Sequence, residues 1–351
     1  MANTVPREFA CFSRDEARNL SFDSSAVKYY YPPPLPIDLK PGYDKHVKPD
    51  DGRDNHLDAL LSTITDWEKR EGEKCEADFI TWRGMMTKLL TAVYDSRDGF
   101  SMHVTSFQGT IFIEEDYEYK MAGEARRNSQ PGHQRGGLTP QMMVYFGSKF
   151  EKLALLPDIW DNCSRDLIEG REHEIPGNFT EYCSVVKCCF GGEHSTVFGG
   201  EVDAVWDEKP ENPQDSPVNW VELKVTSRPP GRRGNQEVWQ LKLLKYWAQS
   251  YLLGVPKVIV GFRDNQGILH EIQEWETQKI PEMAVRWSPA VCYNALVQIL
   301  TFLRDNVGTD SGFFKLERQP SGQFITLTRI SDNGPEKILS KEFLEWRKQF
   351  E

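Results

Sequence analysis

The chain has 351 residues and a formal net charge of −11, with 39% hydrophobic and 12% aromatic residues. This apolar content can bury a core, which excludes a globally disordered protein, and no apolar run reaches the roughly 18 residues of a membrane helix. Seven cysteines without framework spacing indicate a reducing compartment, and Met1 to Phe9 lacks the apolar stretch of a signal peptide. The acidic charge argues against nucleic-acid contact by Lys and Arg alone, but a nuclease that binds metal ions must concentrate carboxylates.

The first 138 residues mix irregular and helical patterns. We expect residues 1–55 to form an extended arm laid over the domain, because the prolines of Tyr29-Tyr30-Tyr31-Pro32-Pro33-Pro34 exclude a helix interior. Periodicity predicts helices over about 56–68 and 77–93, and apolar runs predict strands around 107–113. Residues 120–138 are rich in Gly, Arg, Asn and Gln, which is typical of a flexible loop.

The remainder predicts alternating strands and helices. Thr139-Pro140 has the form of a helix cap followed by a proline at the first helical position. We expect helices at about 139–156, 235–252, 288–305 and 340–349, and strands at 180–190, 195–206, 220–226 and 257–262, with an acidic loop at 207–219. With no repeat and no break in composition, residues 1–351 are interpreted as a single α/β domain with a mixed, largely antiparallel central sheet flanked by helices.

Two short acidic patterns carry the chemistry. Residues two apart on a strand point to the same face, so Glu201 and Asp203 should project together, as should Glu222 and Lys224. A hairpin through the acidic loop would set these polar faces side by side. Carboxylate-rich sites suit Mg²⁺ or Mn²⁺. Either pattern alone is common on solvated strands, but an acid–x–acid strand followed by an acid–x–Lys strand is the arrangement of PD-D/E-x-K nucleases.

Six segments make the resemblance sharper. They are Trp82-Arg83-Gly84, Gly147-Ser148-Lys149-Phe150-Glu151, Glu201-Val202-Asp203, Glu222-Leu223-Lys224, Lys245-Tyr246-Trp247-Ala248-Gln249-Ser250 and Gly261-Phe262-Arg263. In this order they resemble the eukaryotic decapping exoribonuclease family, above all the fungal partner protein of the nuclear 5′-to-3′ exoribonuclease. The similarity spans about residues 10 to 265.

The resemblance implies a role for each matching residue. Glu151, Asp203, Glu222 and the Leu223 carbonyl would bind metal, with Glu201 acting directly or through a metal-bound water. Lys224 and Gln249 would hold the nucleophilic water or the scissile phosphate, and Trp82 and Arg83 would contact RNA near its 5′ end. The cofactor would be Mg²⁺ or Mn²⁺, most simply two ions that activate water and bridge the phosphate.

The implied activity is metal-dependent hydrolysis of RNA 5′ ends. Family members remove incomplete or non-standard caps, hydrolyse 5′-triphosphate ends or degrade 5′-monophosphate RNA. Two alternatives stay open. One is an accessory protein that mainly binds and stabilises a nuclear 5′-to-3′ exoribonuclease, and the other is a DNA nuclease on the same fold. The resemblance implies a nuclear location, with the cytoplasm as the alternative, and no membrane partner.

Overall fold

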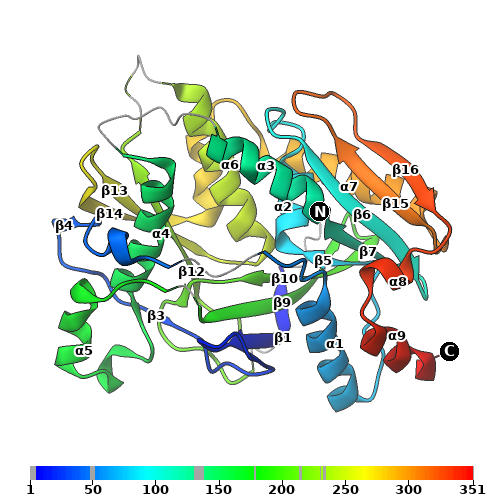
Figure 1. Ribbon diagram of the computed structural model, residues 1–351, viewed down its shortest axis with the longest axis horizontal. Coiled ribbons are helices and arrows are strands. Elements are labelled where there is room, and N and C mark those ends of the chain that lie inside the picture. The colour runs from blue at the N-terminus through cyan, green and yellow to red at the C-terminus, as the bar shows by residue number, and fades with distance from the viewer. Residues whose placement is uncertain are drawn as a thin grey trace.

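The computed structural model describes residues 5–47, 52–129, 138–177, 179–212, 216–229, 231 and 235–350, except for the side chains of 127–129. Within these residues the strands divide between a nine-stranded and a seven-stranded mixed sheet, with helices packed around them (Figure 1). The expected class, a single α/β domain with mixed sheets flanked by helices, is confirmed, although there are two sheets in place of one. No helix in the described part of the chain combines the length and apolar character needed to cross a membrane.

The nine-stranded sheet is antiparallel except where β5 pairs with β7 and with β10. Its strands, in spatial order, are β16 (Thr326–Ser331), β15 (Phe313–Arg318), β6 (Phe100–Phe107), β7 (Thr110–Glu115), β5 (Phe79–Trp82), β10 (His194–Glu201), β9 (Glu181–Phe190), β1 (Arg7–Arg14) and β2 (Leu20–Ser21).

The seven-stranded sheet is antiparallel except where β12 pairs with β13 and β11 with β3. In spatial order it contains β4 (Ile37–Asp38), β14 (Ile268–Glu276), β13 (Lys257–Arg263), β12 (Trp220–Ser227), β11 (Ala204–Val205), β3 (Tyr29–Tyr30) and β8 (Leu155–Leu156).

Helices cover both sheets. The α-helices are α1 (Asp58–Glu71), α2 (Arg83–Thr91), α3 (Tyr117–Ser129), α4 (Pro140–Ala154), α5 (Arg165–Gly170), α6 (Gln236–Leu252), α7 (Pro289–Asn306), α8 (Pro335–Ile338) and α9 (Lys341–Arg347). Short 3₁₀ turns are η1 (Tyr43–Lys45), η2 (Trp160–Asn162), η3 (Arg171–His173), η4 (Thr277–Met283) and η5 (Lys348–Phe350). Helices α2, α6 and α7 share one core with both sheets, whereas α1 and α9 pack on the other face of the nine-stranded sheet and α4 on the other face of the seven-stranded sheet.

The N-terminal segment is more than an arm. Residues Arg7–Arg14 form β1, which pairs along its whole length with β9, and Tyr29–Tyr30 form β3 beside β11. The alternating burial of Glu8, Ala10 and Phe12 is the period-two pattern of a strand, which the charged residues in this stretch obscure. The expectation of an irregular surface arm is therefore wrong for these parts.

Two further expectations are wrong. The helix expected at 77–93 begins only at Arg83, because Phe79-Ile80-Thr81-Trp82 has the aromatic and β-branched character of a strand and forms β5. The loop expected at 120–138 is helix α3 up to Ser129, and Asp116 caps its start by accepting the Tyr119 N–H at 3.1 Å. The rest of that loop, 130–137, lies outside the described residues.

Candidate active site

The chain passes from one sheet to the other between Glu201 and Ala204. Glu201 ends β10, whereas Ala204 opens β11 in the seven-stranded sheet. The prediction that Glu201 and Asp203 lie on one continuous strand is therefore wrong, because the strand breaks between them. Asp203 still contacts the segment Glu222-Leu223-Lys224, because its Oδ2 accepts a 2.6 Å hydrogen bond from the Leu223 N–H. The predicted hairpin is confirmed, since β11 pairs antiparallel with β12.

Glu222 lies at the centre of the site. Its side chain is buried, and it points from β12 to the same side as Lys224, as the strand geometry predicts. Lys224 Nζ contacts Glu222 Oε1 at 2.5 Å, and Arg83 Nη1 contacts Oε2 at 3.5 Å. Arg83 opens α2 directly after β5, so this ion pair joins the two sheets.

Glu151 comes from the last turn of α4, which packs on β12 through Phe150 and Leu153. The expected cap of this helix is confirmed, because Thr139 Oγ1 accepts the Met142 N–H at 3.2 Å and Pro140 occupies the first turn. Burial, together with the negative charge of Glu201, raises the pKa of Glu151 to about 7. Part of that shift comes from repulsion between neighbouring carboxylates, as expected of a shared site.

The pKa shifts of Asp203, Glu201 and Glu222 also fit a shared acidic site. Burial raises the pKa of Asp203, and the charges of Glu222 and Glu151 raise it further. The pKa of Glu201 is also raised, by desolvation and by Glu181, although Glu201 is exposed at the end of β10. For Glu222, burial favours the neutral form, but Lys224 and Arg83 outweigh it and lower the pKa.

The donor set fits a hard divalent cation. Four carboxylates from separate stretches of chain repel one another here, and cations would relieve that repulsion. Among the described residues no three His, Cys, Asp or Glu side chains are already arranged to hold a metal ion, and Glu222 instead contacts Lys224 and Arg83. A carboxylate has about four lone-pair sites, so Glu222 has acceptor capacity beyond these two partners. The role of the Leu223 carbonyl as a ligand stays a prediction.

Gln249 and Trp82 lie at the edge of the site. Gln249 is half-buried on α6, one turn beyond Tyr246, whose ring centroid is 5.9 Å from Lys224 Nζ. Trp82 is beside Arg83 in the chain, but its indole packs against Gly199 and donates its Nε1–H to the His56 carbonyl at 3.0 Å. The contacts of Gln249 and Trp82 with substrate stay predictions.

Sequence patterns did not reveal three residues that shape the site. A Cβ on Gly200 would lie 2.8 Å from Arg83 Cβ, and one on Gly199 would lie 2.8 Å from the Trp82 ring. Glycine therefore lets β10 approach β5 and α2, and the Gly-Gly pair directly before Glu201 was the available signal. Lys28, whose charge lowers the pKa of both Glu151 and Glu201, had no signal in the sequence.

A pocket of about 460 Å³ adjoins the carboxylates. Glu151 lies in its wall, together with the basic side chains of Lys28, Lys152 and Arg171. Its apolar lining comes mainly from Leu155, Leu156, Pro157, Leu167, Ile175, Pro176 and Phe179. Glu16 and Glu174 also line it, and Glu174 forms an ion pair with Lys152, so the pocket offers apolar walls with both basic and acidic side chains.

Comparisons with known proteins match most of the chain. The family model described as "RAI1 like PD-(D/E)XK nuclease" matches residues 4–344. Decapping nuclease RAI1 of Emericella nidulans is 43% identical over 347 residues, covering 97% of this chain and 93% of the relative. Rai1 of Candida albicans in complex with pU5-Mn²⁺ has a TM-score of 0.88 and 29% identity, covering 98% of this chain and 96% of that chain. Rai1 of Scheffersomyces stipitis in complex with (3′-NADP)⁺ and calcium ion has a TM-score of 0.89 and 30% identity, covering 99% of this chain and 97% of that chain.

Proposed function

This chain belongs to the family of RAI1-like PD-(D/E)XK nucleases, and from this premise we propose that it is a divalent-metal-dependent decapping nuclease acting on RNA 5′ ends. Its substrates would be RNAs with incomplete or non-standard caps, 5′-triphosphates or 5′-monophosphates. The pU5-Mn²⁺ complex of one relative supports an RNA substrate and a divalent metal. The complex of another relative with (3′-NADP)⁺ and calcium ion supports a dinucleotide-capped end as a further substrate.

The observation that carries the proposal is the environment of Glu222. Lys224 and Arg83 contact its two oxygens, while Asp203 is anchored beside it on β12. A buried carboxylate with two cationic partners, next to carboxylates with raised pKa values, is typical of a site prepared for metal and phosphate. A solvated acidic strand would show neither the burial nor the raised pKa values.

Each residue has a distinct task in this mechanism. Glu151, Asp203 and Glu222 would hold the cations, most simply two, with Glu201 at their solvent side. Bound cations would lower the pKa of a water molecule and stabilise charge on the scissile phosphate. Lys224 stays protonated at neutral pH, because Glu222 and Asp203 outweigh its burial and raise its pKa. It can therefore orient water or phosphate as a cation but cannot act as a base.

Substrate binding would use both sides of the acidic cluster. Arg83 offers a guanidinium next to Glu222 for a phosphate near the 5′ end. The 460 Å³ pocket at Glu151 would take the group that is released, because its apolar walls suit a base and Lys28, whose charge acts on Glu151, would attract a phosphate. Gln249 would assist Lys224 from α6.

A panel of RNAs tests the proposal. Purified protein is incubated with triphosphate, monophosphate, unmethylated-capped and NAD-capped RNA in Mg²⁺ or Mn²⁺, and with DNA of the same sequence, and the released products are identified. Glu201→Ala with Asp203→Ala should abolish metal-dependent hydrolysis while leaving the fold intact. Glu274→Ala with Glu276→Ala is the matched control, because it removes an acid–x–acid pair from the exposed face of β14. Near-normal hydrolysis by the first double variant would contradict the proposal.

The resemblance also supports a nuclear location and a nuclear 5′-to-3′ exoribonuclease as partner. Co-purification of this protein with that exoribonuclease from nuclear extract tests both. If the wild type yields no RNA product with either metal ion but stabilises the exoribonuclease, the protein acts as an accessory protein and the proposal of a nuclease is refuted.

A further inference from the structure

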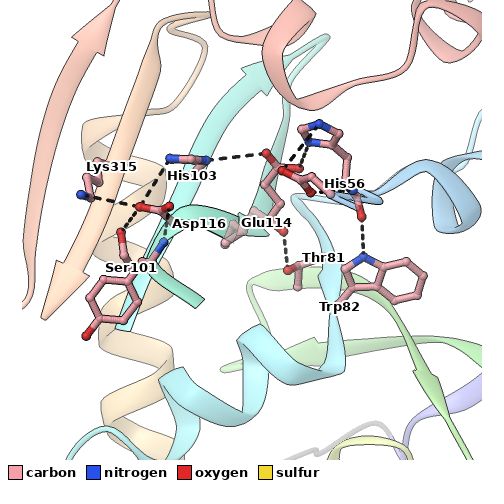
Figure 2. Close-up of polar contacts among 11 residues, drawn as sticks. His56, Thr81, Trp82, Ser101, His103, Glu114, Asp116 and Lys315 are labelled. Atoms are coloured by element: carbon pink, nitrogen blue, oxygen red, sulfur yellow. Dashed lines mark hydrogen bonds and ion pairs between the residues drawn. The ribbon is translucent and has the colours of Figure 1, made fainter. Parts of the chain in front are cut away.

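A chain of alternating acidic and basic side chains runs along one face of the nine-stranded sheet, at the side of Trp82 (Figure 2). We call it the polar relay, and its members are Asp54, His56, Glu114, His103, Asp116 and Lys315. Its successive side-chain contacts are 3.7, 3.0, 3.7, 3.8 and 3.6 Å. The middle of the relay follows strand pairing, because Lys315 lies opposite His103, and His103 opposite Glu114.

His56 connects the relay to Trp82 through an unusual backbone conformation. Its φ angle is +43°, in the left-handed region that a non-glycine residue rarely adopts. Three contacts hold it there. Asp54 Oδ1 accepts its N–H at 3.0 Å, Glu114 Oε2 contacts its Nδ1 at 3.0 Å, and its carbonyl accepts the Trp82 indole N–H at 3.0 Å. A strained conformation persists only where such contacts enforce it.

The indole contact leads directly to the acidic site. Trp82 is fixed on its other side by Gly199, where no side chain larger than a hydrogen fits. The next residue is Arg83, whose guanidinium contacts Glu222 at 3.5 Å. Trp82 is the N-cap residue of α2, so the contacts that fix its indole also restrain the backbone from which the Arg83 side chain extends.

We propose that His56 and Glu114 are positioning residues for RNA binding, which fix Trp82 and thereby hold Arg83 in place beside Glu222. This inference rests on the proposed function, in which Arg83 contacts RNA. Neither residue needs to touch the substrate. Glu114 is buried, so its side chain is a rigid support for the histidine ring.

Protonation of His56 should strengthen its contact with Glu114 and so the positioning of Trp82. The charged groups that act on its ring are Asp54, Glu114 and Asp58. His56 also lines a 290 Å³ pocket, together with Arg53, Glu115 and Lys120, and this pocket gives the ring access to solvent. Burial lowers the pKa of His56, but Glu114 and Asp54 outweigh it and the pKa is raised. The attraction to Glu114 is therefore complete below the ordinary histidine pKa and is lost as pH rises through the raised value.

The experiment measures binding of a 5′-phosphorylated oligouridylate, labelled at its 3′ end, by fluorescence anisotropy with Ca²⁺ from pH 6 to 8.5. The variants of the full chain are Arg83→Ala, His56→Asn and the double variant, because asparagine tolerates the left-handed conformation but lacks the ring. We expect Arg83→Ala to weaken binding about tenfold and His56→Asn to weaken it in the same direction. The double variant should be no weaker than Arg83→Ala alone, since both changes remove the same contact.

Two controls separate positioning from general loss of structure. Lys315→Met removes the far end of the relay, beyond His103, and should leave binding unchanged. Glu114→Gln keeps the side-chain shape and one acceptor oxygen but removes the charge. It should weaken binding as His56→Asn does, and it replaces that variant in the test if His56→Asn folds poorly. The ratio of wild-type to His56→Asn affinity should fall as pH rises through the His56 pKa. The ¹⁵N-indole resonance of Trp82, assigned with Trp82→Phe, should shift with pH in the wild type and not in His56→Asn.

The outcomes are distinguishable. If Arg83→Ala binds as the wild type does, both the RNA-binding role of Arg83 and this inference are overturned. If Arg83→Ala weakens binding but His56→Asn and Glu114→Gln do not, the inference alone is overturned. The same holds if the effects of Arg83→Ala and His56→Asn add in full, because a shared pathway forbids additivity.

Discussion

Gly200→Ala tests whether the spacing between β10 and α2 sets the active site. The added Cβ would lie 2.8 Å from Arg83 Cβ and 2.9 Å from Leu253 Cδ1. Ordinary carbon contacts begin near 3.5 Å, so the neighbours must yield by about 0.7 Å. Overpacking of this kind costs about 1–3 kcal/mol of unfolding free energy. The Arg83–Glu222 contact is already 3.5 Å long, so a shift of this size would break it, and misplacement of about 1 Å can cost 10²-fold in rate.

The assay compares kcat/KM on the preferred RNA with the midpoint of urea unfolding. Gly170→Ala is the matched control, because its Cβ meets no atom within 4 Å and its backbone is helical. We expect Gly200→Ala to lose far more activity than the fraction of unfolded protein explains, and Gly170→Ala to lose none. Unchanged kcat/KM in Gly200→Ala would show that Leu253 moves instead and would refute the argument from close packing.

Burial and charge lead to four further predictions. Because the pKa of Glu151 is raised to about 7, Mn²⁺ binding at pH 7 should release about half a proton from this group. Calorimetry in two buffers measures the protons released, and Glu151→Gln should remove this half proton. Without metal, the same raised pKa stabilises the protonated fold, so this contribution falls as pH rises from below the ordinary glutamate pKa through about 7. Arg347→Met should lower the free energy of urea unfolding by about 3–5 kcal/mol, because Glu68 loses its partner in a fully buried ion pair. The control Arg70→Met removes only an exposed ion pair and should lower it by under about 0.5 kcal/mol. Mn²⁺ at 100 times its dissociation constant should stabilise the wild type by about 2.7 kcal/mol in thermal unfolding, and Glu201→Ala with Asp203→Ala should lose that gain.

Local patterns predicted the elements that position most of the site. The cap at Thr139-Pro140, the alternation around Glu222 and the long amphipathic helix at about 235–252 all depend on neighbours in sequence. The structure contains each of them, with the helix at Gln236–Leu252. The resemblance then identified Glu151 and Arg83, which no local pattern marks. The order of the family's motifs predicts that they share one site with Asp203 and Glu222.

Features that depend on tertiary contacts were not predicted. The strand β1 is stabilised by pairing with β9, although its own sequence is charged. The break between Glu201 and Asp203 follows from the change of sheet, which an alternating pattern cannot reveal. The close approach at Gly199 and Gly200 and the support of Trp82 by His56 join segments more than 100 and 20 residues apart, respectively.

The crossing between the sheets also bears on how this protein matures. Glu201 ends a strand of one sheet, and Glu222 belongs to the other, while Arg83 links them. Strands of the two sheets alternate along the chain, and both sheets share one core. Neither sheet alone carries the full set of charged groups, so competence to cut RNA requires that the whole domain has folded.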